Sequence, residues 1–559
     1  MSARGASWRR TGCNNVNGAR ALLTMLRSAG VDRLFGNPGT TEVPLLDELA
    51  SFDGITYHLV LQEGVAVGMA DGYAQAAGRV GVLSLHVTGG VANALGLLYN
   101  ASRAGTPLLV LSGQQDTRLA LQEPFLYSDM VRWVRPLVKW AHEVAHPSDL
   151  PRALRRALRE AVAPPSGPVF LAVPLDVLRA QDVPVEDLGP PATPRTGADP
   201  AAVSAAADLL RRARAPLIVA GDRVAHAGAE ATLLALAEAT GWPVALEPYP
   251  TRFVFPSPHA QARSPLPRFA AGVRAALEAH DVVLVIGLTP FEHFLYDGAS
   301  PLPPGTRVIH FDLAPAFIAR NHPVAVGVCG DLPGALASLR ENLGRASRGD
   351  LPGATIGGGP RPSGPTPFDD PYAPVADVIA GVVEPHDILV EEAISARAAI
   401  LGRVPRSVPG TLFGEKGGTI GWGFPAALGV GLARPGTGVF AVVGDGSFLM
   451  EVQGLWTAAR DGIAIVLIVL NNRGYAILKQ GLASLGGEAA RRGVYPGTDV
   501  PGVDLLGLAR SFGVAGERVA AAPGRPWASE LRQVLRRARN AGGPVLVEVV
   551  LDVPVRPLA

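Results

Sequence analysis

Short runs of β-branched and other apolar residues alternate with Ala- and Leu-rich segments of helical period along most of this 559-residue chain. Alternating strands and helices favour a parallel sheet, because consecutive parallel strands need a crossover connection, which is usually a helix. The strand-like runs are apolar nearly throughout, as expected for strands that helices cover on both faces. We therefore predict an α/β protein built from mostly parallel sheets flanked by helices.

Two Pro- and Gly-rich stretches without apolar periodicity interrupt this alternation. They leave three blocks, which agrees with the prior of about 150 residues for one domain. We therefore predict three α/β domains behind a loose N-terminal tail. The predicted bounds are 1–15 for the tail, 181–200 and 345–374 for the linkers, and 16–180, 201–344 and 375–559 for the domains.

The strands matter most for locating a site, because ligands of parallel α/β sheets bind beyond the carboxyl ends of the strands. In the first block we predict helices near 63–77 and 91–103 and strands over 56–60, 80–85 and 107–112. The middle block has predicted strands over 216–220, 281–286 and 306–311. In the last block, predicted strands over 438–443 and 464–470 bracket a helix that includes Glu451, Leu455 and Trp456.

Charge and cysteine content narrow the choice of partner. The 50 Lys and Arg residues balance 49 Asp and Glu residues, so the net charge of +1 gives no field that would attract nucleic acid or an anionic membrane. No apolar run reaches the roughly 18 residues that a membrane span needs. Cys13 and Cys329 predict neither a disulfide framework nor a zinc site, so a reducing cytoplasm is expected. We expect a small-molecule partner, with no nucleic acid and no membrane.

A metal diphosphate site is predicted in the last block. Gly444, Asp445, Gly446 and Ser447 follow the strand at 438–443, and Asn471 and Asn472 follow the strand at 464–470. The helix between these strands brings Asp445 and Asn472 to the same sheet edge. A carboxylate and an amide oxygen are ligands that Mg²⁺ accepts, and the glycines let backbone N–H groups approach a diphosphate. Either fragment alone also fits a turn or a helix cap.

The Gly-Asp-Gly and Asn-Asn pair at this spacing resembles the signature of the thiamine-diphosphate-dependent enzymes. The resemblance implies that Mg²⁺ is held by the Asp445 carboxylate, the Asn472 side chain and the backbone carbonyl of Gly474. It also implies that the diphosphate completes the shell of the metal beside Gly444, Gly446 and Ser447. The motif identifies a cofactor and leaves the reaction open.

Two further segments resemble the parts of these enzymes that hold the aminopyrimidine ring of the cofactor. Glu63 stands where a predicted strand meets a small-residue helix; alone, it would also fit a role at the helix dipole. The resemblance implies that Glu63 bonds the ring and promotes loss of the proton from the reactive thiazolium carbon. In the segment 417–425, it implies that the carbonyl of Gly418 and the N–H of Ile420 hold the ring, while the Ile420 side chain wedges beneath the cofactor.

Within this family, the chain up to residue 180 resembles the benzoylformate decarboxylases, through residues 36–40, 61–63, 71–76, 85–86, 113–115 and 135–140. His86 is implied to bind the substrate carboxylate and to move protons. His293, in the middle block, aligns across one gap with their second active-site histidine. Thr40 stands where those enzymes have a serine that contacts the substrate carboxylate, so the hydroxyl is kept while an added methyl group changes the pocket.

The resemblance implies a thiamine-diphosphate- and Mg²⁺-dependent lyase that removes CO₂ from an aryl or bulky 2-oxo acid without oxidation and releases an aldehyde. An acetolactate-synthase-like carboligase stays open as the alternative, and a non-catalytic cofactor-binding protein as a more remote one. His86 and His293 favour the decarboxylase, whereas Thr40 and Ile420 fit both enzymes.

The resemblance also implies how the chain assembles. In this family the first domain binds the pyrimidine end of the cofactor and the last domain binds the diphosphate end, each from a different subunit. Glu63 and the motif at 444–446 would therefore meet across a subunit interface. We expect a homodimer or a homotetramer with active sites at its interfaces.

Overall fold

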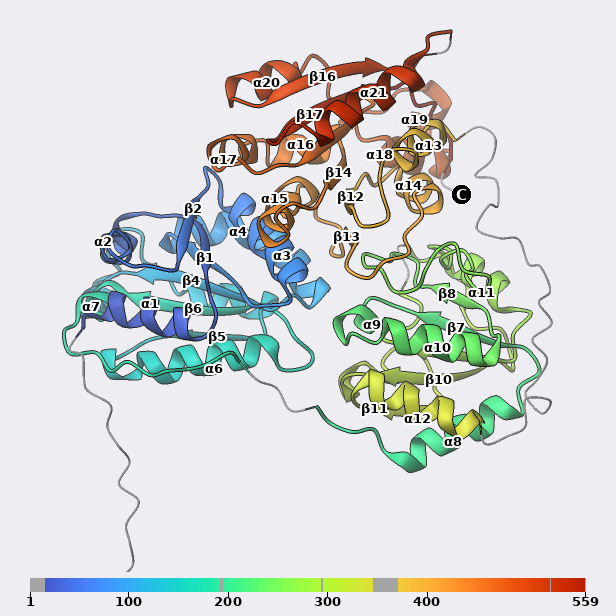
Figure 1. Ribbon diagram of the computed structural model, residues 1–559, viewed down its shortest axis with the longest axis horizontal. Helices are drawn as coiled ribbons and strands as arrows, with labels where there is room; N and C mark the ends of the chain where they lie inside the picture. The colour runs from blue at the N-terminus through green and yellow to red at the C-terminus, as the bar shows by residue number, and fades with distance from the viewer. Residues whose placement is uncertain (1–15, 192–194, 293–294, 345–369, 523, 558–559) are drawn as a thin grey trace, which may run out of the picture. The chain divides into compact units, whose positions relative to one another are not determined.

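The computed structural model describes residues 16–191, 195–292, 295–344, 370–522 and 524–557 (Figure 1). The predicted tail, His293 and residues 345–369 of the second predicted linker lie outside the described residues. The chain divides into two compact units, one up to residue 193 and one from residue 194 onward. The first unit holds one parallel sheet and the second holds two, which confirms the prediction of three α/β domains.

The first sheet has six parallel strands in the order β2-β1-β3-β4-β6-β5. Its strands are β1 Arg33–Asn37, β2 Thr56–Leu59, β3 Gly81–Leu85, β4 Leu108–Gln114, β5 Trp140–Glu143 and β6 Val169–Pro174. The helices of this unit are α1 Gly18–Ser28, α2 Val43–Leu49, α3 Glu63–Ala77, α4 Val87–Ala104, α5 Met130–Val134, α6 Leu150–Val162 and α7 Leu175–Arg179. Every residue of β3, β4 and β6 is buried, because helices cover both faces of the sheet.

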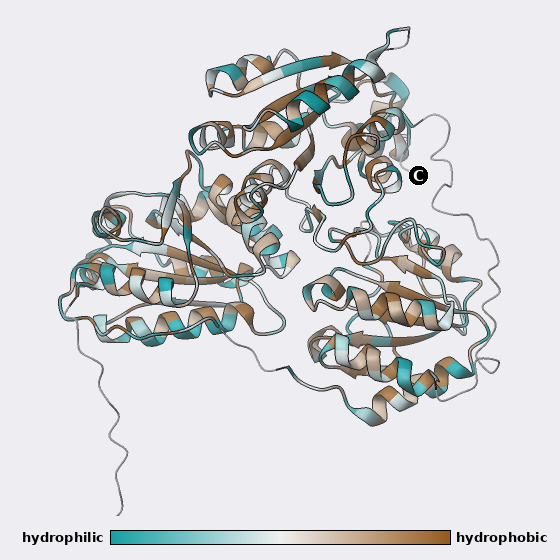
Figure 2. Ribbon diagram, viewed as in Figure 1, coloured by the Kyte–Doolittle hydropathy of each residue, from teal (hydrophilic) through white to brown (hydrophobic). Residues whose placement is uncertain are grey.

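Two helices of this unit show how side-chain size and spacing set burial. In α6, buried Leu and Ala side chains recur every three or four positions, at Leu150, Ala153, Leu154, Ala157 and Leu158. Arginines occupy the opposite side of α6, which Figure 2 shows as a hydrophilic outer face. By contrast, α3 is rich in Gly and Ala and is buried almost all round, so its neighbours can approach it closely.

The middle domain has a five-stranded parallel sheet in the order β11-β10-β9-β7-β8. Its strands are β7 Pro216–Ala220, β8 Val244–Leu246, β9 Val282–Ile286, β10 Arg307–Asp312 and β11 Val326–Cys329. Its helices are α8 Pro200–Arg211, α9 Arg223–His226, α10 Glu230–Thr240, α11 Ala270–Leu277 and α12 Leu332–Gly344.

The last domain has a six-stranded parallel sheet in the order β13-β12-β14-β15-β17-β16. Its strands are β12 Ile388–Glu392, β13 Leu412–Gly414, β14 Val439–Gly444, β15 Val466–Asn471, β16 Ala515–Ala520 and β17 Val545–Val550. Its helices are α13 Ala373–Ala380, α14 Arg397–Arg403, α15 Gly423–Ala433, α16 Asp445–Met450, α17 Gly454–Arg460, α18 Ala476–Leu485, α19 Glu488–Arg492, α20 Leu505–Ser511 and α21 Trp527–Arg539.

The first and last sheets share one strand order, since β12 to β17 take the places of β1 to β6. In the first sheet, β1 and β3 are neighbours, and the chain leaves them in opposite directions: β2 lies on the far side of β1 and β4 on the far side of β3. In the last sheet, β12 and β14 are neighbours in the same way, with β13 beyond β12 and β15 beyond β14. The carboxyl ends of these strand pairs therefore flank a topological switch point, where open α/β sheets bind their ligands. The ends of β7 and β9 form the equivalent point of the middle sheet.

Three local features differ from the simplest reading of the sequence. The single helix predicted around Glu451 is two short helices, because the backbone of Glu451 leaves the helical region at the end of α16. Pro200, the last residue of the first predicted linker, already begins α8, where a missing N–H costs no hydrogen bond. Val183 of the same linker is buried and pairs with Val16.

Over the described residues, no helix is long and apolar enough to cross a membrane.

Candidate functional site

The first cluster of predicted site residues lies at the switch point of the first sheet. Asn37, at the end of β1, is paired with Leu85, at the end of β3. The chain beyond β1 forms a short 3-10 turn at Thr40–Glu42, and the chain beyond β3 begins with His86. The sheet register therefore brings the turn and the histidine together.

Glu42 holds His86 by a direct side-chain contact. The Oε2 atom of Glu42 lies 2.9 Å from Nδ1 of His86, and the Thr41 hydroxyl lies 3.2 Å from the same nitrogen. Glu42 is 2% exposed and also accepts the backbone N–H groups of Gly39 at 2.9 Å and Gly113 at 2.8 Å. These bonds satisfy a buried carboxylate, which then acts as a fixed acceptor for the imidazole ring.

The backbone around this pair fits the two side chains closely. A Cβ atom on Gly39 would lie 2.2 Å from the His86 ring, and one on Gly113 would lie 2.2 Å from Glu42 Oε1. Both positions therefore require glycine. Val87, directly after His86, has a φ of +27°, which is a strained conformation for a β-branched residue. Such strain persists where the surrounding structure over-determines the backbone, and it clusters at functional sites.

The contact with Glu42 also sets the charge and the tautomer of His86. The hydrogen bond to Glu42 raises the pKa of His86 above its usual 6.5, although partial burial acts in the opposite direction. Because Nδ1 faces Glu42, it carries a proton, and Nε2 is the nitrogen that can exchange one with a ligand. The arrangement can therefore deliver a proton or bind an anion.

Thr40 and Glu63 are the other two predicted site residues of the first unit. Thr40 is exposed at the start of the 3-10 turn, while its neighbour Thr41 is the buried residue that contacts His86. Glu63 is the first residue of α3 and is 8% exposed; its Oε2 accepts the Asn93 amide at 3.0 Å. The negative charge of Glu63 makes the smallest contribution to the raised pKa of His86, after that of Glu42.

The second cluster lies in the last domain, where β14 runs into α16. Asp445 is 4% exposed, and its Oδ2 accepts the backbone N–H of Gly474 at 3.0 Å. A Cβ on Gly446 would lie 2.4 Å from the Tyr475 ring, and one on Gly474 would lie 2.4 Å from the Thr498 carbonyl. The segments after β14 and β15 therefore contact each other, through Asp445 with Gly474 and through Gly446 with Tyr475.

The two asparagines that follow β15 have different partners. Asn471 is buried; its amide nitrogen donates to Glu548 at 2.7 Å and its oxygen accepts the Arg473 N–H at 2.9 Å. The amide nitrogen of Asn472 donates to the Tyr372 hydroxyl at 3.0 Å, which leaves the Asn472 oxygen as the group that can bind a cation. Asn471 thus supports the turn, and Asn472 is the candidate ligand.

These residues fit a hydrated divalent cation with a diphosphate. Burial raises the pKa of Asp445, although backbone N–H groups lower it, so a cation beside this carboxylate would relieve a real desolvation cost. Over the described residues, no group of three or more His, Cys, Asp and Glu side chains could hold a metal. A metal at Asp445 must therefore take its other ligands from amide, backbone and diphosphate oxygens, as Mg²⁺ does.

Space for a ligand lies at the same sheet edge. A cavity of about 300 Å³ is lined by Asp445, Leu449, Asn471, Arg473, Val500, Gly502, Val503, Leu505, Arg518, Ala520, Glu548 and Val550. Several of these residues end or follow strands β14 to β17. The carboxyl edge of the last sheet is therefore hollowed, as expected for a ligand-binding edge.

The third predicted segment connects β13 to α15. Gly418 has a φ of +87°, which favours glycine, and its N–H donates to Glu415. Ile420 is half-buried, and a Cβ on Gly421 would lie 2.9 Å from the Cβ of Met450 in α16. Gly418 and Ile420 therefore lie on a tight loop that packs beside the helix carrying Asp445.

Sequence reasoning missed two buried carboxylates, Glu42 and Glu392. Glu392 ends the buried strand β12, and its position there becomes informative only once the strand order is known. Glu42 lies in the 3-10 turn after β1, where no local signal marks it. His293 lies outside the described residues, so its place in the site stays a prediction.

The Glu42 contact predicts a pH-dependent contribution of His86 to stability. A histidine whose pKa is raised on folding stabilises the protein fully below its usual 6.5, and this stabilisation is lost as the pH rises through the raised value. The variant H86N should therefore lose more unfolding free energy relative to the parent protein near pH 6 than near pH 9. Urea unfolding at both pH values measures the difference.

Glu42→Gln provides the control, because it removes the acceptor charge and keeps the side-chain shape. In that background, the pH dependence of the H86N effect should be much smaller, because only burial and the weaker contribution of Glu63 remain. A pH-dependent difference of equal size in the E42Q background would show that another group is responsible.

Comparisons with known proteins agree with this geometry. The chain is 36% identical to a benzoylformate decarboxylase of Pseudomonas aeruginosa over 95% of this chain and 98% of that protein. It is 29% identical to an acetolactate synthase large subunit of Parasynechococcus marenigrum over 97% of this chain and 88% of that protein. Its fold matches the solved 4-hydroxybenzoylformate decarboxylase of Rhodococcus jostii RHA1 with a TM-score of 0.86, at 30% identity, over 96% of this chain and 100% of that one.

Family models match all three domains. The N-terminal thiamine pyrophosphate-binding domain matches residues 16–130, the central domain of the same enzymes matches 203–339, and the C-terminal thiamine pyrophosphate-binding domain matches 400–549. Together with the sheet topology and with relatives that align over nearly the whole chain, these matches establish that the chain belongs to the thiamine pyrophosphate enzyme family. Members of this family include decarboxylases and acetolactate synthases.

Proposed function

We propose that this chain is a thiamine-diphosphate- and Mg²⁺-dependent, non-oxidative decarboxylase that converts an aryl or bulky 2-oxo acid into an aldehyde and CO₂. The observation that carries the proposal is His86, fixed by Glu42 at the switch point of the first sheet. The benzoylformate decarboxylase relatives support the same substrate class. The domains proposed to hold the two ends of the cofactor are 16–180 and 375–559.

Glu63 is proposed to face the pyrimidine ring of the cofactor. When bound, thiamine diphosphate supplies a carbon nucleophile and an electron sink for the loss of CO₂. The buried Glu63 carboxyl, oriented by Asn93, would share a proton with the ring and so assist the removal of the proton from the reactive carbon. Gly418 and Ile420 are proposed to contact the same ring from the loop before α15.

His86 is proposed to act on the substrate. A raised pKa keeps more of the imidazole protonated near neutral pH. A protonated imidazole suits the binding of the substrate carboxylate and, after CO₂ has left, the delivery of a proton to the carbon that carried the carboxylate. Nε2 would make this contact, because Nδ1 faces Glu42. The exposed Thr40 hydroxyl is proposed to bind the carboxylate as well, and His293 remains the proposed second proton carrier.

The metal site is proposed to consist of Asp445, Asn472 and the Gly474 carbonyl. The backbone around Gly444, Gly446 and Ser447 would receive the diphosphate. This assignment is supported by the desolvated Asp445 carboxylate and by the orientation of Asn472 through Tyr372.

An acetolactate-synthase-like carboligase is the second candidate. It is favoured by the relatives of that name, which align over nearly the whole chain. Such an enzyme would use the same cofactor residues and differ in delivering a second carbonyl compound in place of a proton. The proton-bearing His86 is the feature that favours the decarboxylase.

Removing the metal should remove the cofactor. Chelation followed by gel filtration should abolish activity, and Mg²⁺ with thiamine diphosphate should restore it, because in the proposed site the metal would join Asp445 to the diphosphate. Asp445→Ala should lose cofactor binding, measured by calorimetry.

Glu63→Gln should keep the cofactor and lose roughly 100-fold or more in kcat. Undiminished turnover by E63Q would overturn the proposed role of Glu63.

The assembly is proposed to be a homodimer or a homotetramer, since Glu63 and Asp445 would come from different subunits to form one site. Light scattering combined with an activity assay at the same dilutions tests this. Activity should fall as the dimer dissociates and should return on concentration. A monomer that retains full activity would contradict the shared site.

The substrate class is tested with a panel of aromatic, branched and short 2-oxo acids, reading CO₂ release together with aldehyde and acyloin products. Aromatic or bulky acids should give free aldehyde in proportion to CO₂. Acetolactate-type products from pyruvate without free aldehyde would instead establish the carboligase.

His86→Ala separates the substrate role from the cofactor role. The variant should lose roughly 100-fold in kcat/KM, the usual scale of a lost general acid or base, while the cofactor affinity stays near that of the parent. An equal loss of cofactor affinity would mean that His86 serves the cofactor rather than the substrate.

A further inference from the structure

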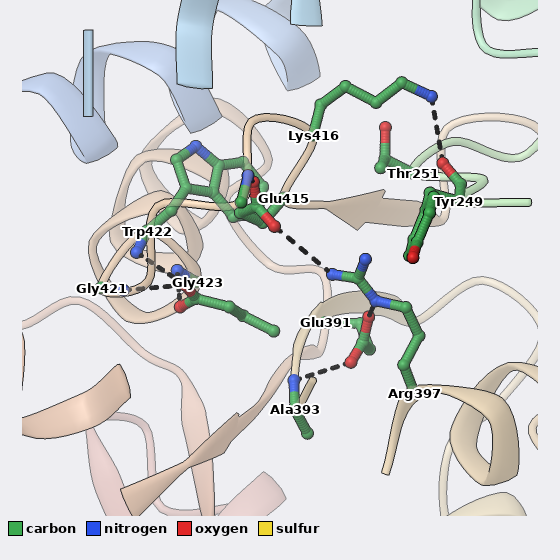
Figure 3. Close-up of polar contacts among 12 residues, drawn as sticks. Tyr249, Thr251, Glu391, Ala393, Arg397, Glu415, Lys416, Gly421, Trp422 and Gly423 are labelled. Atoms are coloured by element: carbon green, nitrogen blue, oxygen red, sulfur yellow. Dashed lines mark hydrogen bonds and ion pairs between the residues drawn. The ribbon is translucent and has the colours of Figure 1, made fainter. Parts of the chain in front are cut away.

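Glu392 stands at the switch point of the last sheet with its carboxylate fully buried. It ends β12 and is paired with Val443 of β14, directly before the Gly444–Ser447 motif. Its Oε1 accepts the N–H groups of Gly421 at 2.7 Å and Trp422 at 3.2 Å, and its Oε2 accepts the N–H of Gly423 at 2.6 Å. Figure 3 shows these three backbone groups converging on one carboxylate.

These N–H groups lead into α15: Gly423 is its first residue, Trp422 is its N-cap and Gly421 directly precedes the cap. The first N–H groups of a helix have no partner within the helix, and a negative charge there is favourable. Here the acceptor is the side chain of Glu392 from β12, and the side chain of the N-cap residue Trp422 makes no capping hydrogen bond. The position of the turn Gly421–Gly423 is therefore tied to β12, and not only to its own chain neighbours.

A second group of buried charges holds the other end of the same loop. Glu415 accepts the Gly418 N–H, and Arg397 contacts Glu415 at 3.8 Å and Glu391 at 2.6 Å. Lys416 donates to the Tyr249 carbonyl at 3.0 Å, as Figure 3 also shows. The loop is thus held by buried carboxylates at two points, at Gly418 by Glu415 and at Gly421–Gly423 by Glu392.

The burial of Glu392 has a cost that its hydrogen bonds offset. Burial, with the nearby charge of Glu415, raises the pKa of Glu392, and the three N–H groups lower it. Because both oxygens accept N–H groups, the geometry fits the ionised carboxylate. An apolar side chain would avoid that cost but would leave three backbone donors without an acceptor in the core. The close fit leaves little freedom, since a Cβ on Gly423 would lie 2.7 Å from the Cβ of Glu392.

We propose that Glu392 is a positioning residue for thiamine diphosphate. It fixes the turn Gly421–Gly423 directly after Ile420 and so, together with Glu415 at Gly418, holds the loop in the shape that receives the pyrimidine ring. The inference rests on the proposed contacts of Gly418 and Ile420 with the cofactor. Glu392 itself does not touch the ligand; it acts through the backbone of the loop.

Glu392→Gln is the sharpest test, because it changes one atom and keeps the volume. The amide oxygen can still accept from Gly421 and Trp422, but the amide nitrogen would face the N–H of Gly423, which places two donors against each other. The loop should shift at this point. Glu392→Asp keeps the charge and withdraws the carboxylate by one methylene, so it tests position separately from charge and also serves if E392Q fails to fold.

Asp387→Asn is the matched control at the opposite end of the same strand. Asp387 is 3% exposed, precedes β12, accepts the Glu384 N–H at 2.7 Å and pairs with Arg539 at 3.0 Å. Its substitution also disturbs a buried carboxylate, but one that lies directly before β12, at the strand end remote from the switch point. Loss of stability alone should therefore appear in D387N as well as in E392Q.

The measurement uses the full-length protein freed of cofactor by chelation and gel filtration. Calorimetry gives the Kd of thiamine diphosphate at fixed Mg²⁺, and thermal unfolding without cofactor gives the stability of each variant. E392Q and E392D should bind about ten-fold more weakly than the parent, which corresponds to about 1.4 kcal/mol. D387N should bind as the parent does, even where its midpoint of unfolding falls.

The outcomes separate this inference from the proposed function. If the parent protein does not bind thiamine diphosphate, the proposed function fails. If the parent binds and E392Q and E392D bind equally well, or if D387N loses as much affinity as E392Q, the role of Glu392 is overturned. Weaker binding by both Glu392 variants, with unchanged binding by D387N, supports it.

Discussion

A buried carboxylate that accepts backbone N–H groups stands at the switch point of each of the three sheets. Glu42 accepts from Gly39 and Gly113 beside β1, and Glu392 accepts from the turn before α15. In the middle domain, Asp222, two residues after β7, accepts the N–H groups of Thr251 and Arg252. A parallel sheet leaves loops at its carboxyl edge without ladder partners, and a charged acceptor can fix several of them at once. The shape of each edge depends on this interaction.

The first and last sheets use this same device for different chemistry. In the first, the acceptor also contacts a side chain, so Glu42 both shapes the loop and sets the proton affinity of His86. In the last, all three bonds to Glu392 from the turn before α15 come from the backbone, and Asp445 is a separate buried carboxylate that accepts the Gly474 N–H. One strand order thus places a histidine held by a carboxylate at the edge of one sheet and a separate buried carboxylate at the edge of the other.

Local signals explain what the sequence predicted well. The bounds 63–77 for α3 match because Gln62 caps its first N–H groups and Gly78, in the left-handed conformation, ends it. The contacts of Glu42 with His86 and of Glu392 with Gly423 join residues separated by 44 and 31 positions, and no local periodicity encodes them. The division between α16 and α17 was missed for a related reason, because the backbone of Glu451 departs from a helix inside a segment of helical composition.

The motif residues were predictable because their chemistry is local, whereas their supports are set by topology. Asp445 and Asn472 each follow a strand, so strand positions alone place them at one edge. The supports depend on which strands are neighbours: β12 precedes β13 in the chain but also pairs with β14, and only that second pairing sets Glu392 beside the Gly444–Ser447 motif. A carboxylate at the end of the first strand of such a sheet is therefore a candidate support once the strand order is known, and an unremarkable acidic residue before that.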